Sequence, residues 1–138
     1  MKHWTTYPLV AHPYNPEFVS GANLARFARA AEAAGFDGIA FTDHPVPSDK
    51  WLNAGGHDAL DPFAALTYVA AVTERLRLIP NIVVLPYRNP FHVAKAAATI
   101  DVHARPTVLR GATGADGKLY VSGVSVSRKN ACRPSVPS

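Results

Sequence analysis

Asp43 and His44 stand together directly after a short apolar stretch, Ile39 to Phe41, and directly before Pro45. A carboxylate and an imidazole are side chains that hold or move protons in enzymes, and histidine titrates nearest to neutral pH. Polar side chains that end a buried parallel strand gather at the carboxyl edge of the sheet, where α/β barrels place their active sites. The pair, with Thr42 beside it, is therefore the first candidate for acid–base chemistry.

Strand and helix patterns alternate in front of this pair. We expect a first strand over residues 5–11, then a helix whose apolar residues recur at helical spacing. Ser20 or Asn23 is the expected cap of this helix, and Gly35 is its expected end. The second strand follows at once and ends at the candidate pair.

A long polar loop over residues 45–60 follows the pair, and loops of this length are usually functional lids or disordered segments. Asp61-Pro62 then predicts the start of a helix that runs to about Arg75, because an N-cap followed by proline favours a helix start. Asn89-Pro90 repeats the same signal and predicts a third helix.

Between these two helices, residues 76–85 form an apolar, β-branched run that predicts a third buried strand. Pro80 lies inside this run, and proline cannot donate a backbone hydrogen bond to a neighbouring strand. We therefore expect a bulge or irregular pairing near Asn81. The resulting order of three strand–helix units predicts an α/β fold with parallel strands and right-handed crossovers. Three units cannot close a barrel by themselves.

Charge divides the chain into two parts. Residues 1–102 hold eight Lys/Arg and nine Asp/Glu, whereas residues 103–138 hold six and one. This predicts a domain over 1–102 and a basic, poorly ordered tail over 103–138, and a solvated tail explains the positive charge better than nucleic-acid binding does. No apolar run approaches the roughly 18 residues of a membrane span and no leader pattern is present, so we expect a cytoplasmic protein without a membrane partner.

A set of motifs, in order and spacing, carries a family resemblance. They are Ala-Ala-Glu-Ala-Ala-Gly-Phe-Asp-Gly at 30–38, Phe-Thr-Asp-His-Pro at 41–45, Asp-Ala-Leu-Asp-Pro at 58–62, Val-Thr-Glu-Arg at 72–75 and Ile-Val-Val-Leu-Pro-Tyr-Arg-Asn-Pro at 82–90, with Ala94-Lys95 and Thr99-Ile-Asp101. Over about residues 5–102 this combination resembles the N-terminal part of the luciferase-like monooxygenase family. The members that use the deazaflavin coenzyme F420 look most similar.

The resemblance implies a partial (β/α)8 TIM barrel, about the first three βα units of a chain more than twice this length, followed by an irregular tail. It implies reduced FMN or F420 at the carboxyl ends of the strands, with monooxygenation or hydride transfer on a small-molecule substrate. A homodimer is the expectation for full-length relatives. Beyond residue 103 the family pattern stops, so we expect a truncated chain with at best half of the cofactor site, and its own activity is left open.

The resemblance also implies roles for individual residues. Asp43 and His44 become the catalytic pair: His44 would exchange or hydrogen-bond a proton beside the reactive ring, and Asp43 would orient the His44 imidazole. A non-prolyl cis peptide bond is implied between Asn81 and Ile82, against which the ring would pack. The cofactor-binding residues implied in this way are Asn81, Ile82, Thr42 and His12, although His12 is equally well explained as a surface loop histidine.

Four further residues are candidates for substrate or lid contacts, and each has an ordinary alternative. Trp51 could cover a substrate or anchor the long loop. His57 could touch substrate or cap the loop. Tyr87 and Arg88 could meet a cofactor or a partner subunit, or be a loop aromatic and a solvated charge.

Two other classes of protein stay open. Asp43 and His44, together with His12 and His57, are also the residue types of metal-dependent hydrolases on α/β barrels. The first-strand His-x-His pair of such enzymes is missing, because only His12 stands there, and we assign no metal ligands. The third reading is a non-enzymatic fragment that associates with another subunit through its open strand edge.

Overall fold

The computed structural model describes residues 1–103, 112–113 and 119–121. Its centre is a parallel sheet of β1 (Trp4–Thr6), β2 (Gly38–Phe41) and β3 (Arg77–Pro80), in the order β1-β2-β3. Ile39 in the middle strand pairs with Thr5 on one side and Leu78 on the other. In this described part the sheet is open, with β1 and β3 at its edges. The mixed α/β fold is compatible with a partial barrel, and the described residues form no closed barrel.

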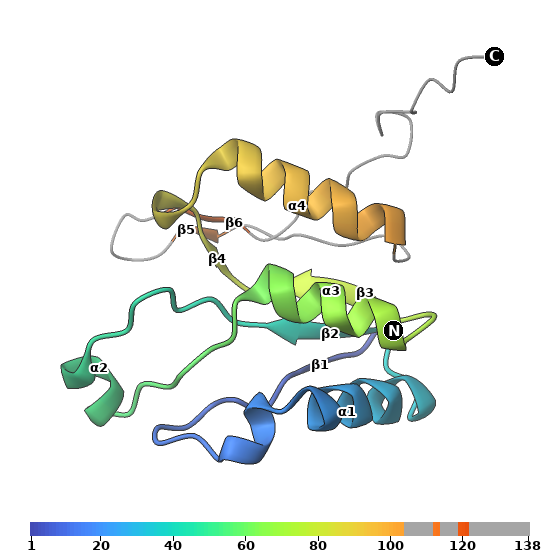
Figure 1. Ribbon diagram of the computed structural model, residues 1–138, viewed down its shortest axis with the longest axis horizontal. Helices are drawn as coiled ribbons and strands as arrows, with labels where there is room; N and C mark the ends of the chain where they lie inside the picture. The colour runs from blue at the N-terminus through green and yellow to red at the C-terminus, as the bar shows by residue number, and fades with distance from the viewer. Residues whose placement is uncertain (104–111, 114–118, 122–138) are drawn as a thin grey trace.

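Three helices lie side by side (Figure 1): α1 (Gly21–Ala33), α3 (Pro62–Val72) and α4 (Pro90–His103), with α3 in the middle and α1 and α3 against the sheet. Ser20 rather than Asn23 caps α1, because its hydroxyl accepts a 3.2 Å hydrogen bond from the Asn23 amide. The Asp61 carboxylate caps α3 in the predicted way by accepting from the Ala64 amide at 2.9 Å. Gly35, with φ of +85°, follows the end of α1, as expected.

The core lies between the helices and the sheet. Ile39 and Leu78 of the strands are fully buried against Ala28 of α1 and Leu66 of α3. All four residues of β2 are buried, instead of alternating with exposed residues. Burial on both faces is expected for a strand of a parallel sheet. The helices therefore fix the sheet from one side, and the loops that follow the strands are free to build a site.

Two strands end earlier than the sequence predicts. β1 ends at Thr6 instead of residue 11; the Tyr7 amide still donates to the Ala40 carbonyl at 2.9 Å, and Pro8 then has no amide hydrogen to continue the pairing. The third strand is interrupted, as Pro80 indicates: β3 stops there, and β4 (Val83–Val84) and the short 3-10 helix η2 (Leu85–Tyr87) follow. The peptide bond between Asn81 and Ile82 is cis, at the position implied by the family resemblance.

Helix α3 ends at Val72, before the predicted end near Arg75. Thr73 is already extended, with φ of −133° and ψ of 159°. The carboxylate of Glu32 on α1 accepts hydrogen bonds from the backbone amides of residues 74–76, which turns the chain into β3. Hydrogen bonds to a side chain distant in sequence thus take the place of the predicted last helical turn.

The predicted tail over 103–138 lies mostly outside the described residues. Two short strands in it are described, β5 (Ala112–Thr113) and β6 (Leu119–Val121), and they form an antiparallel sheet with β4 in the order β4-β6-β5. Neither strand was predicted from the sequence. Among the described helices, none has the length and apolar character needed to cross a membrane.

Candidate active site at the strand ends

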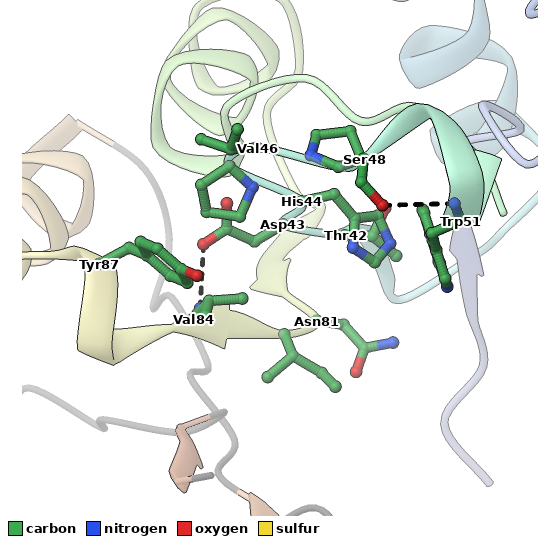
Figure 2. Close-up of a pocket in the computed structure, with 12 residues that line it drawn as sticks. Thr42, Asp43, His44, Val46, Ser48, Trp51, Asn81, Val84 and Tyr87 are labelled. Atoms are coloured by element: carbon green, nitrogen blue, oxygen red, sulfur yellow. Dashed lines mark hydrogen bonds between the residues drawn. The ribbon is translucent and has the colours of Figure 1, made fainter. Parts of the chain in front are cut away.

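A cleft of about 420 Å³ opens where β2 and β3 end (Figure 2). Thr42, Asp43 and His44 line it from the end of β2, as predicted, and Asn81 and Ile82 line it from the end of β3. Trp51 and Tyr87 complete it from the two loops beyond, together with Pro45, Val46, Pro47, Ser48 and Val84. Most of the residues singled out by the sequence therefore meet in one place.

Asp43 does not point toward His44. Its side chain is buried, and Figure 2 shows it directed toward Val84, whose backbone amide donates to Oδ2 at 3.0 Å. Arg88 adds a two-pronged ion pair, with Nε at 3.0 Å from Oδ2 and Nη2 at 2.9 Å from Oδ1. The Asp43 carboxylate is thus held by Arg88 and the Val84 amide. The structure does not show the predicted contact by which Asp43 would orient the His44 ring.

Arg88 ties three elements together. Besides Asp43, its Nη2 contacts the Asp61 carboxylate at the start of α3 at 2.8 Å, and its guanidinium lies 5.4 Å from the centre of the Phe63 ring. The hydrogen bond to Asp43 raises the pKa of Arg88, burial lowers it, and the contact with Asp61 raises it further, so the pKa is raised overall. Two carboxylates thus engage this cation, which explains Arg88 better as a clamp than as a contact to cofactor or substrate.

His44 lies on the other side of the cleft, next to Trp51 (Figure 2). The centres of these two rings are 4.9 Å apart, and the His44 Nε2 lies 3.4 Å from the Nε2 of His57. Burial lowers the pKa of His44, the neighbouring His57 lowers it further, and the charge of Asp43 acts in the opposite direction. The imidazole is therefore favoured in its neutral form, which can accept a proton.

Trp51 reaches His44 because the predicted loop contains a short helix, α2 (Asp49–Asn53). Ser48 caps this helix by accepting from the Trp51 amide at 3.3 Å. The six-membered ring of Trp51 lies directly over Gly56, where an added Cβ would come within 2.6 Å of the Trp51 Cδ2 atom. Glycine is required at this position for close packing, and the loop is partly ordered by its own side chains.

A second line of contacts anchors the same loop from the opposite end. The His57 Nδ1 lies 3.0 Å from the backbone carbonyl oxygen of Asp58, and the Asp58 carboxylate lies 2.8 Å from the Nδ1 of His12. His12 and His57 are outside the lining of the main cleft, but they connect to it through His44. Asp58, which joins them, was not among the predicted site residues; its signals in the sequence were its place beside His57 and in the Asp-Ala-Leu-Asp-Pro motif at 58–62.

No group of three or more His, Cys, Asp or Glu side chains is arranged to hold a metal ion within the described ranges. The parts that the structure does show are parallel α/β units with a partly apolar cleft at the carboxyl ends of the strands. Such clefts are where α/β proteins of this class bind small molecules and cofactors.

Comparison with known sequences assigns the family. The sequence model of the luciferase-like monooxygenase family matches residues 3–105, so this chain belongs to that family. An F420-dependent glucose-6-phosphate dehydrogenase of Tsukamurella paurometabola is 40% identical over 81 residues, 56% of this chain and 22% of that protein. A dibenzothiophene-sulfone monooxygenase of Rhodococcus erythropolis is 33% identical over 94 residues, 62% of this chain and 20% of that protein. The matching part thus covers about a fifth of the length of these relatives.

Proposed function

We propose that this chain forms part of the cofactor site of an oxidoreductase that uses a reduced deazaflavin or flavin on a small-molecule substrate. F420 is the first candidate and FMN the second, because the relative named for F420 has the higher identity, 40% against 33%. The observation that carries the proposal is the position of His44, whose pKa burial lowers, in the lining of a cofactor-sized cleft at the strand ends.

The residues around the cleft fit the ring system of such a cofactor. Its volume of about 420 Å³ lies within the roughly 300–1,000 Å³ common for ligand pockets. Val46, Ile82 and Val84 offer apolar contact, and Trp51 offers an aromatic face. The described lining residues include no Lys or Arg, and Arg88 is already paired with two carboxylates. The cleft therefore supports binding of the ring, and a phosphate-bearing tail would need other residues.

When bound, the cofactor would supply the two-electron chemistry, and this chain's residues would position it and manage a proton. In the proposal, a nitrogen of the His44 imidazole holds or accepts a proton. The Thr42 hydroxyl donates or accepts one hydrogen bond at the edge of the cofactor ring next to His44. Trp51 covers His44 on the solvent side. Asp43 acts at a distance, because it fixes the Val84 amide and Arg88 rather than a reacting atom.

Binding of each cofactor in each redox state tests the proposal. The purified chain would be titrated with reduced and oxidised F420 and, separately, FMN, while fluorescence and thermal melting are followed. We expect saturable binding of reduced F420 with a raised melting temperature. His44→Ala should weaken binding about tenfold, which corresponds to the loss of one hydrogen bond and a ring contact. The exposed His92 provides the matched control, since His92→Ala should leave affinity unchanged.

Saturable binding of FMN alone would transfer the proposal to the second cofactor. Absence of binding by all four forms would reject it and favour the non-enzymatic reading, in which the fragment associates with another subunit. Retention of full affinity by His44→Ala would reject the role given to that residue. The cytoplasmic location and the homodimer of full-length relatives stay predictions from the sequence.

A further inference from the structure

The contact between His57 and Asp58 fixes the position of one proton. A carbonyl oxygen can only accept a hydrogen bond, so the His57 Nδ1, 3.0 Å from the Asp58 carbonyl, must carry a hydrogen. A neutral imidazole has a single N–H group. The Nε2 of neutral His57 therefore has a free lone pair, and this lone pair belongs to the nitrogen that faces His44.

The second ring follows from the first. The two Nε2 atoms are 3.4 Å apart, with the ring planes at 79°. Two lone pairs at this distance would repel each other, whereas an N–H facing a lone pair forms a hydrogen bond. We propose that His57 is a positioning residue that holds His44 in the tautomer protonated at Nε2, so that His44 Nδ1 is the nitrogen that accepts and returns a proton.

The surrounding contacts hold this pair in place. Trp51 lies against both rings, 4.9 Å from His44 and 5.9 Å from His57 between ring centres. Asp58 is anchored through its carboxylate to His12 at 2.8 Å, which steadies the backbone carbonyl that His57 binds. His12, predicted to be a cofactor-binding residue, is thus connected to His44 through three contacts, by way of Asp58 and His57.

The charged groups near His44 come from several elements. His57 faces it from the long loop, and Asp43 precedes it on the same segment. A neighbouring hollow beside Asp43 and His44 is also lined by Asp61, Tyr87 and Arg88. Arg88 pairs with both carboxylates and offsets part of their negative charge, so the charge of Asp43 raises the pKa of His44 by less than burial and His57 lower it. Burial and the second imidazole together favour the neutral ring.

The arrangement has a chemical consequence. Adding a proton to His44 at Nδ1 leaves its Nε2–H in place, and the hydrogen bond to His57 persists. Removing that proton restores the starting state without turning either ring. His44 can therefore pass through both protonation states with its geometry unchanged, which is what a preorganised proton acceptor requires. This use of Nδ1 rests on the proposed function, whereas the tautomer itself does not.

Long-range proton–nitrogen NMR spectra of the histidine rings read the tautomer directly in the chain without cofactor. We expect the wild type to show His44 protonated at Nε2 and unprotonated at Nδ1 at a pH above its titration. His57→Phe keeps an aromatic ring but removes the acceptor, so both tautomers should appear. His57→Gln restores an acceptor through its amide oxygen and should recover the single tautomer. His92→Phe is the control and should change nothing.

A wild-type spectrum with His44 protonated at Nδ1 would overturn the inference even if no variant folds. An unchanged His44 tautomer in His57→Phe would also overturn it. F420 binding, measured as a function of pH, then distinguishes the positioning role proposed for His57 from the proposed cofactor site. Correct tautomers without any F420 or FMN binding would leave the positioning role standing and reject the cofactor site.

Discussion

Removing Arg88 should be the most destabilising single change at the strand ends. The Asp43 side chain is 2% exposed and the Arg88 side chain 21% exposed, so Arg88→Ala leaves a buried carboxylate whose remaining hydrogen-bond donor among the described residues is the Val84 amide. Breaking a buried ion pair by removing one partner costs about 3–5 kcal/mol. We expect the lower end, about 3 kcal/mol of unfolding free energy, because Arg88 is partly exposed and the Val84 amide still serves Asp43.

Urea denaturation followed by circular dichroism measures this loss as a lower midpoint at unchanged slope. Arg26 is an exposed arginine of α1, and Arg26→Ala is the control, expected within about 0.5 kcal/mol of wild type. Asp43→Asn removes the buried charge, so Arg88→Ala should cost less in that background. A coupling energy of at least about 1 kcal/mol is the expected result of the double-mutant cycle.

The reasoning would be refuted by an Arg88→Ala variant as stable as Arg26→Ala. Purely additive effects of Asp43→Asn and Arg88→Ala would refute it as well, since they would show that the two side chains do not depend on each other in the folded chain.

Three further predictions concern other contacts. Gly56→Ala should displace the Trp51 ring and raise its solvent exposure, seen as a red-shifted indole fluorescence; an unchanged emission maximum would contradict the close contact. Burial would raise the pKa of Glu32, but hydrogen bonds from three backbone amides and the charge of Arg75 outweigh it and lower the pKa. Its stabilising effect should therefore be complete above the ordinary pKa, about 4.3, and fade as the pH falls below it. Glu32→Gln should flatten this part of the pH–stability curve, and an unchanged curve would contradict the assignment. Asp43→Asn should leave the His44 tautomer unchanged in NMR spectra, in contrast to His57→Phe; a new tautomer would revive the orienting role of Asp43.

The features that sequence predicts well here depend on near neighbours. Ser20 and Asp61 cap their helices through amides three residues ahead, and Pro80 interrupts a strand at its own position. Each signal acts within a few residues, so the local sequence contains both partners. The order of strands and helices follows from the same local patterns, which is why the parallel sheet was predictable.

The contacts that define the site join residues far apart in the chain. Arg88 meets Asp43 across 45 positions, and His12 meets Asp58 across 46. A local pattern cannot show which carboxylate a cation will find, because that depends on how the strand ends come together. The same limit applies to the end of α3, where Glu32 from another helix binds the backbone amides after Val72.

Asp43 and His44 illustrate why adjacency in sequence misleads. Successive side chains of an extended backbone point to opposite sides, so neighbouring residues at a strand end rarely face each other. Here Asp43 turns toward Arg88 and Val84, and His44 turns toward Trp51 and His57. The carboxylate keeps the cleft in shape while the imidazole remains available for a proton. A partner able to set the state of His44 therefore has to come from another segment, and the loop that carries His57 supplies it.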